Sequence, residues 1–218
     1  MRCAAMGCGN YTGEFALGQP QEQAAIVFFD SCNFAFIPAL EAQWRSVRDE
    51  LLALPHSKFE PWKETYLYEA GWDVFGLYAF GKRVEENCRL APRTAAIVEA
   101  VPGLITAGFS SLQPGTHIQP HVGYQYDYSE DGELTTRREL NTRVLRMHLG
   151  LIVPETFTPI GCAMRVGEEL RNWEEGKCLV FDDTIQHEAW NRATTTRVVL
   201  LLDFLRPPDE AARQHVRV

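Results

Sequence analysis

Three of the histidines in the second half of the chain, His121, His148 and His187, are candidates for metal or ligand binding. His121 is followed closely by Gly123, and His187 lies six residues after Phe181, so both are expected where strands meet loops. Two imidazoles from separate strands can bind divalent iron, zinc or copper. The usual non-haem iron triad also has a carboxylate two residues after its first histidine, where this chain has glycine. The spacing therefore predicts an incomplete metal triad.

The segment 144–151 has the alternation of a strand with one polar face. Arg146, His148 and Gly150 share that face, and the opposite face carries Leu145, Met147, Leu149 and Leu151. Burying a cation beside an imidazole costs several kcal/mol unless partners compensate. The pattern favours an inward-facing pair that binds an anion, with a solvent-exposed face as the alternative.

The last apolar run, residues 197–204, has apolar residues on both faces except at its first position, Arg197. A strand buried on both sides that begins with arginine is well placed to bind a carboxylate through two parallel hydrogen bonds. Arg197 is therefore the second candidate for an anion site.

The elements that must position these residues are helical first and β-rich afterwards. Apolar residues at spacings of four and three predict one helix over 38–54, and Pro92 predicts the start of a second over 92–100. A short strand is expected at 27–29. After residue 105, runs with period two predict strands at 108–112, 117–121, 144–153, 178–181 and 197–204. This order predicts an α+β chain with a β-sandwich or barrel core.

Composition limits the classes of protein that remain. The 218 residues (24.7 kDa) are 45% hydrophobic and carry 21 Lys and Arg against 29 Asp and Glu, a net charge of −8. This acidity argues against nucleic acid as a partner. The sequence shows neither an apolar run of membrane length nor a signal peptide, so we expect no membrane association and a cytoplasmic location. The six cysteines form no C-x-x-C pair and are expected to be free thiols.

Two segments fall outside the periodic pattern. Residues 1–22 are glycine-rich and predict a loose N-terminal segment before a single domain, 23–218. Residues 124–143 are polar and interrupt the β region, either as a solvated loop or as a substrate lid. Asp127, Glu130 and Asp131 in this insert are alternative sources of a third metal ligand.

From Ser110 to Pro207 the chain resembles the aspartyl/asparaginyl β-hydroxylases. The matching stretches are Gln113–His117 with Pro120-His121, Leu145–Leu151, Trp173–Lys177, and Phe181–Asp183 with His187-Glu188; Pro38–Trp44 and Gly71–Leu77 extend the likeness upstream. The resemblance implies a double-stranded β-helix core of the cupin (jelly-roll) type with N-terminal flanking helices. It also implies a non-haem dioxygenase that uses Fe(II), 2-oxoglutarate and O2.

The resemblance also implies roles for individual residues. His121 and His187 match the family's two iron ligands, and Gly123 matches the glycine that replaces its carboxylate. Ser110, Arg146, His148 and Arg197 match the residues that hold 2-oxoglutarate, with Arg197 facing the distal carboxylate and Arg146 also counted as catalytic. Asp182, Asp183 and Glu188 are expected as possible partners that orient His187.

Two departures from the family concern the substrate. The animal peptide hydroxylases have an arginine where this chain has Val144, and the insert 124–143 lengthens the stretch before Arg146. We therefore expect a soluble hydroxylase of a small molecule, an amino acid or a short peptide, such as one that tailors a specialised metabolite. The alternatives are a hydroxylase of aspartyl or asparaginyl residues in peptides or proteins, and a non-catalytic cupin-like binding protein.

Overall fold

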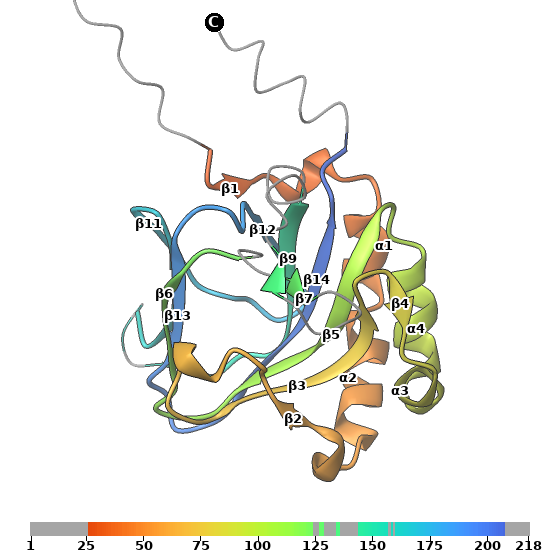
Figure 1. Cartoon of the computed structure of the whole chain (residues 1–218), viewed down its shortest axis with the longest axis horizontal. Coiled ribbons are helices and arrows are strands. Elements are labelled where there is room, and N and C mark those ends of the chain that lie inside the picture. Colours follow the sequence, from red (N-terminus) through yellow and green to blue (C-terminus); the bar gives the residue numbers. More distant parts are fainter. Residues whose placement is uncertain are drawn as a thin grey trace, which may run out of the picture.

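The structure, a computed structural model, describes residues 26–123, 127–128, 134–135, 144–156, 158 and 160–207. Two sheets dominate it (Figure 1). The larger sheet has the order β1-β12-β9-β14-β5-β3-β2, with β4 paired to β3. Its strands are β1 (Phe28–Phe29), β2 (Glu60–Pro61), β3 (Trp72–Ala79), β4 (Lys82–Arg83), β5 (Leu104–Leu112), β9 (Val144–Ile152), β12 (Cys178–Phe181) and β14 (Arg197–Leu205).

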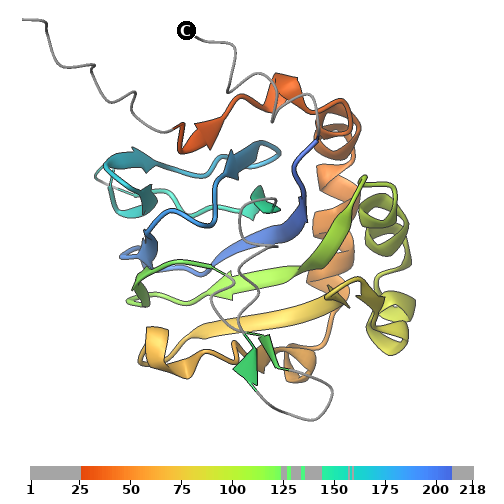
Figure 2. The ribbon, with the colours of Figure 1, turned by 45° about the horizontal axis from the view of Figure 1, so that its top comes forward.

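The smaller sheet has the order β11-β10-β13-β6 and is also antiparallel. Its strands are β6 (His117–His121), β10 (Cys162–Val166), β11 (Glu169–Arg171) and β13 (His187–Asn191). The two sheets face each other, as Figures 1 and 2 show, and apolar side chains pack between them. The fold is the expected double-stranded β-helix of the α+β class.

Four helices cover the outer face of the larger sheet (Figure 1). They are α1 (Ile37–Ala42), α2 (Trp44–Ala53), α3 (Glu85–Leu90) and α4 (Pro92–Glu99). Apolar side chains form one core between these helices and the sheet, and a second core between the two sheets. Packing on both faces explains why β9 and β14 are buried along nearly their whole length.

The helix predictions were partly right. The single helix expected over 38–54 is wrong, because the chain leaves helical geometry at Gln43, with φ −102° and ψ 4°, and forms α1 and α2. The apolar residues of both helices still face one core, which contains Leu40 from α1 and Val47 and Leu51 from α2. The helix expected over 92–100 is confirmed as α4, and α3 was not predicted.

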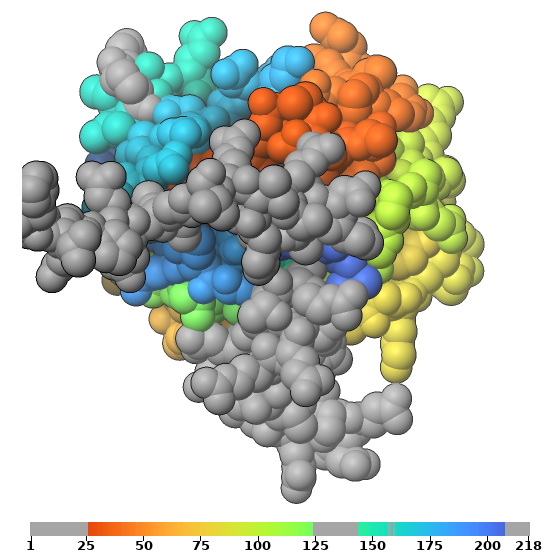
Figure 3. Space-filling view, turned by 90° about the horizontal axis from the view of Figure 1, so that it is seen from above, coloured from red at the N-terminus to blue at the C-terminus, as the bar shows by residue number. Residues whose placement is uncertain are grey.

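All five strands expected after residue 105 are present as β5, β6, β9, β12 and β14, and the strand at 27–29 is present as β1. The prediction missed β3, which pairs with β5 over six residue pairs, and β10, β11 and β13 of the smaller sheet. β1 closes the larger sheet by pairing with β12, so the N-terminal part lies against the second half of the chain (Figure 3).

The N-terminal segment 1–22 lies outside the described residues. Within the insert 124–143, only the short strands β7 (Asp127–Tyr128) and β8 (Leu134–Thr135) are described, and they pair with each other. The lid role and the third ligand expected from this insert stay predictions. Cys88, Cys162 and Cys178 are free thiols, as expected, and Cys3 and Cys8 lie outside the described residues. The described residues contain no helix long and apolar enough to cross a membrane.

Candidate active site

Two imidazoles meet where β6 and β13 pair at their ends, and both line one cavity. His121 is the last residue of β6 and His187 the first of β13, and the register of this strand pair sets them directly opposite each other. Their ring centroids are 4.3 Å apart. Residues 66 positions apart in sequence thus come together because two short strands pair at their ends.

Backbone carbonyls fix both rings in the same way. Nδ1 of His121 lies 2.8 Å from the carbonyl oxygen of Gln119, and Nδ1 of His187 lies 2.8 Å from that of Ile185. A carbonyl oxygen only accepts, so each Nδ1 carries the proton and each Nε2 keeps a free lone pair. An imidazole held through Nδ1 with a bare Nε2 is the usual state of a metal ligand.

A carboxylate stands beside the two rings, although position 123 is glycine. Asp183 is 1% exposed, and its Oδ1 lies 3.2 Å from Nε2 of His187. The backbone of Gly123 donates to the carbonyl of Asp183, and a Cβ built on Gly123 would overlap the Asp183 carboxylate. Asp183 thus occupies the space of a side chain at position 123.

The charges in this corner are compatible with a bound cation, and burial raises the pKa of the Asp183 carboxyl group while Arg146 opposes that rise. Burial, with repulsion from His121 and Arg146, lowers the pKa of His187 to about 3, and burial also lowers the pKa of His121. Both rings are therefore neutral at ordinary pH, and His187 turns a lone pair toward a carboxylate oxygen. A divalent cation bound by the two Nε2 atoms resolves that repulsion, so the residues present fit a metal site. The described residues hold no group of three or more His, Cys, Asp or Glu arranged for a metal.

Arg146 is held by two acids of the chain. Asp203 on the neighbouring strand β14 accepts from Nε at 2.7 Å and from Nη2 at 3.1 Å, and Asp183 pairs with Nη1 at 2.9 Å. All three side chains are buried. The inward orientation predicted for Arg146 is correct, and the sequence reasoning did not foresee these carboxylate partners. Its expected contact with 2-oxoglutarate stays a prediction.

Arg197, His148 and Ser110 form a second polar group in the interior, and two of its nitrogen atoms lack hydrogen-bond partners among the described residues. Arg197 is 1% exposed and donates from Nη1 to the carbonyl of Ser110 at 3.2 Å. Its Nε and the Nε2 of His148 are buried without a hydrogen-bond partner among the described residues. Buried donors without partners are rare and costly, so they mark a place for an acceptor from outside the chain. An anionic ligand fits these donors.

These groups line a single cavity of about 30 Å³ that reaches from the two histidines to Arg197. Its wall contains Ser110, His121, Arg146, His148, His187 and Arg197, together with Trp72, Ile118, Met164, Phe181, Ala189 and Leu201. The cavity therefore joins the expected metal ligands to the expected anion donors. Trp72 anchors the wall by donating from its indole to Oγ of Ser110 at 3.1 Å.

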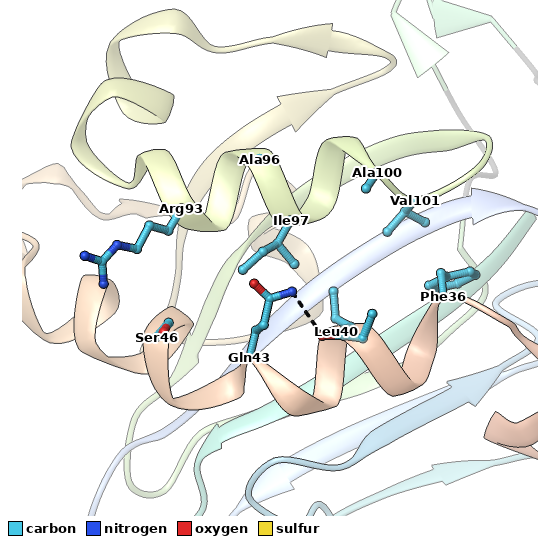
Figure 4. Close-up of a pocket in the computed structure, with 10 residues that line it drawn as sticks. Phe36, Leu40, Gln43, Ser46, Arg93, Ala96, Ile97, Ala100 and Val101 are labelled. Atoms are coloured by element: carbon cyan, nitrogen blue, oxygen red, sulfur yellow. Dashed lines mark hydrogen bonds between the residues drawn. The ribbon is translucent and has the colours of Figure 1, made fainter.

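A larger groove of about 560 Å³ lies elsewhere, between α1, α2 and α4 (Figure 4). Its lining is mostly apolar, from Phe36, Leu40, Ile97 and Val101, and Arg93 is its one charged residue. It brings together no pair of groups suited to acid–base or metal chemistry. The smaller cavity is therefore the candidate active site.

Among the residues expected to orient His187, only Asp183 contacts it. Glu188 instead pairs with His117 at 2.6 Å and with Arg165, and Asp182 binds Thr184 and Arg206. Sequence reasoning missed Asp203 and Trp173 as neighbours of the site. Asp203 lies inside an otherwise apolar run, so the pattern gave no reason to assign it to a polar site. Trp173 lies in a loop, where no periodicity indicates which way a side chain faces.

The sequence matches a family and several curated relatives. Residues 41–207 match the model of a family described as aspartyl/asparaginyl beta-hydroxylase. The chain is 36% identical over 193 residues to an ornithine lipid ester-linked acyl 2-hydroxylase of Rhizobium tropici, covering 85% of this chain and 62% of that protein. It is 35% identical over 181 residues to human aspartyl/asparaginyl beta-hydroxylase, covering 78% and 21%. It thus spans less than two thirds of either relative.

A solved structure shows the same fold at low sequence identity. A prolyl hydroxylase from Trichoplax adhaerens, solved in complex with a peptide fragment, superposes with a TM-score of 0.51. The identity is 14%, and the match covers 81% of this chain and 83% of that one. This likeness supports the double-stranded β-helix.

Proposed function

Because the chain belongs to the aspartyl/asparaginyl β-hydroxylase family, we propose that it is an Fe(II)- and 2-oxoglutarate-dependent dioxygenase. Its substrate in this proposal is a small molecule, an amino acid or a short peptide, which it hydroxylates. This proposal depends mainly on the paired imidazoles of His121, which is partly buried, and His187, which is buried. In each ring Nδ1 donates to a backbone carbonyl, which leaves Nε2 unprotonated.

The metal would be held by His121 and His187, with the Asp183 carboxylate beside them. Bound iron would supply the oxidative chemistry with O2 and 2-oxoglutarate. The chain's own share is to keep both imidazoles neutral by burial and to fix their orientation. Asp183 adds a negative charge that favours a cation at this point and is itself held by Arg146.

The 2-oxoglutarate site would use the unpaired donors of the cavity. Arg197 can bind a carboxylate with its guanidinium edge, and His148 can donate from Nε2. Ser110 contributes from β5, where its backbone carbonyl accepts a hydrogen bond from Arg197. Because these donors line the same cavity as the two histidines, one ligand with an acid at each end would contact both groups. Holding it this way orients it and excludes water from the reacting atoms.

The proposed substrate class depends on a position where this chain differs from the animal peptide hydroxylases. Val144 is 2% exposed and packs at the end of β9, so no cation stands at that position to hold an acidic residue. One relative is named as an aspartyl/asparaginyl hydroxylase and another as an acyl 2-hydroxylase of an ornithine lipid. Membership of the family therefore does not determine the substrate class. Both points support a substrate other than a folded protein domain.

The test is to measure Fe(II) binding without oxygen, and succinate formation from 2-oxoglutarate with oxygen, for the wild type and for His121→Ala and His187→Ala. Each variant should bind Fe(II) at least about tenfold more weakly and form little succinate. His117→Gln is the matched control, since His117 lies on the same strand as His121 but pairs with Glu188. Undiminished iron binding in both alanine variants contradicts the ligand assignment.

Succinate formation also separates the enzyme from a non-catalytic binding protein. A panel of amino acids, short peptides and metabolites is offered to the wild-type protein, and products are screened for the gain of one oxygen by mass spectrometry. Iron binding without succinate across the panel would favour the binding protein. Oxygen gain only in aspartyl or asparaginyl peptides would favour a peptide hydroxylase.

A further inference from the structure

Trp173 lies behind the anion donors of the cavity and touches both of them. It is 4% exposed and belongs to the loop between β11 and β12. Its indole Nε1 donates to Nδ1 of His148 at 3.2 Å. The guanidinium carbon of Arg197 stands 4.4 Å from the centre of the same ring system. One side chain that does not line the cavity thus contacts two side chains that do.

The contact with His148 determines where that imidazole carries its proton. An indole N–H is a donor only, so Nδ1 of His148 must accept. A neutral imidazole has one donor and one acceptor, and the remaining proton therefore sits on Nε2. Burial, with repulsion from Arg197 and Arg146, holds the pKa of His148 well below its usual range, so the ring is neutral. The Nε2–H group is the buried one without a partner.

The contact with Arg197 restricts the orientation of the guanidinium. The guanidinium carbon lies over the indole ring, and this cation–π contact favours one orientation of the side chain over free rotation. Nη1 is fixed by the carbonyl of Ser110, while Nε is buried without a hydrogen-bond partner in the part of the chain that the structure describes. The edge of the guanidinium is thereby held ready for a carboxylate.

The loop reaches this position because β9 has a glycine where the two segments cross. Gly150 lies two residues beyond His148 on the same face, and Glu175 forms a bridge with it. A Cβ on Gly150 would overlap the carbonyl of Glu174. The absence of a side chain at position 150 lets the loop approach the strand, and Trp173 then lies over His148.

We propose that Trp173 is a positioning residue for the cosubstrate site. It fixes His148 as the Nε2–H tautomer and holds Arg197 through a cation–π contact, so that both present donors to one anionic ligand. The identity of that ligand as 2-oxoglutarate rests on the proposed function; the tautomer assignment does not.

The first experiment reads the tautomer directly by NMR of the metal-free protein labelled with 15N in its histidines. In the wild type, His148 should show its proton on Nε2 and a bare Nδ1. Trp173→Phe keeps an aromatic ring over Arg197 but removes the indole N–H, and should shift His148 toward a mixture of tautomers. A proton on Nδ1 in the wild type, or an unchanged tautomer in Trp173→Phe, would overturn the proposal. The wild-type measurement stands even where the variant fails to fold.

The second experiment measures 2-oxoglutarate binding by calorimetry, without oxygen, to protein loaded with Mn(II). Trp173→Phe should weaken binding about tenfold, and its affinity for Mn(II) should stay unchanged. Trp190→Phe is the matched control, because Trp190 is 7% exposed and donates to the carbonyl of Ile160, away from the cavity. It should alter neither the tautomer nor the affinity.

The two readouts separate the two claims. A changed tautomer with unchanged 2-oxoglutarate affinity would overturn the positioning role. Absence of 2-oxoglutarate binding in the wild type would count against the proposed function, while the tautomer result would still decide what Trp173 does to His148.

Discussion

The carboxylate of Asp183 fills the space that a side chain at position 123 would need. Gly123 and Asp183 are joined by a backbone hydrogen bond of 2.8 Å, and a Cβ on Gly123 would overlap the Asp183 side chain. The glycine and the aspartate are therefore one feature of the site. The chain has a carboxylate beside its two imidazoles, but this carboxylate comes from the segment after β12 instead of from the end of β6.

This relationship predicts that a carboxylate cannot simply be added at position 123. Gly123→Asp should lower the free energy of unfolding by about 1–3 kcal/mol, because the new side chain overlaps a buried one. Combining it with Asp183→Gly removes the overlap and should recover much of that loss. Urea unfolding of the two single variants and the double variant measures the coupling. Additive losses would show that the two positions do not share this space.

A second prediction concerns the pair that holds Arg146 in place. Asp203→Asn leaves a buried guanidinium with one charged partner fewer, and should destabilise the protein by about 3–5 kcal/mol. Glu86→Gln removes the acid of an exposed pair with Lys58 and should change stability little. Thermal and urea unfolding of both variants provide the comparison. An Asp203 variant as stable as the Glu86 variant would mean that the buried pair contributes little.

Much of this site was within reach of the sequence. Strict alternation in β9 separated the face of Arg146 and His148 from its apolar face, and the same pattern set Arg197 at the buried start of β14. The pairing of His121 with His187 needed the fold, because strand register brings together residues that spacing leaves 66 positions apart.

Other parts of the structure left no periodic signal. Trp173 works from a loop, and the contacts of Asp203 depend on its strand partner Arg146. The break at Gln43 lies within an unbroken apolar spacing, so the pattern predicted one helix where the chain forms two. Strands β10 and β13 are short and are fixed by pairing with each other. Local sequence patterns predict which side chains share one face of a helix or strand. The pairing of distant strands determines which of these faces come into contact.

The buried His148 predicts how stability depends on pH. Its pKa in the folded protein lies well below 6.5, so below pH 6.5 the unfolded chain binds a proton that the folded chain does not. Stability should therefore fall as pH drops below 6.5, down to the folded pKa. His148→Gln should reduce the slope by up to about 1.4 kcal/mol per pH unit between pH 6 and 4. Urea unfolding of the metal-free proteins across this range measures it, and equal slopes would contradict the assignment.

Arg197 predicts a separation between cosubstrate binding and metal binding. It is buried and lines the cavity, and its Nε has no hydrogen-bond partner among the described residues. Burial lowers its pKa only to about 10, so it stays charged at neutral pH. Arg197→Ala should raise the KM for 2-oxoglutarate about 100-fold, because a charge-assisted pair with the ligand is lost. Affinity for Fe(II) should stay the same. Steady-state kinetics and calorimetry measure the two quantities separately.

The conservative change sharpens this test. Arg197→Lys keeps the charge but loses the planar fork that binds both oxygens of a carboxylate, so its KM should fall between those of the wild type and the alanine variant. Arg192→Ala is the matched control, since Arg192 stacks on Trp190 outside the cavity and should leave the KM unchanged. A lysine variant with the wild-type KM would mean that charge alone recognises the ligand. An alanine variant that binds 2-oxoglutarate normally, while folded by its thermal unfolding curve, would remove Arg197 from the site.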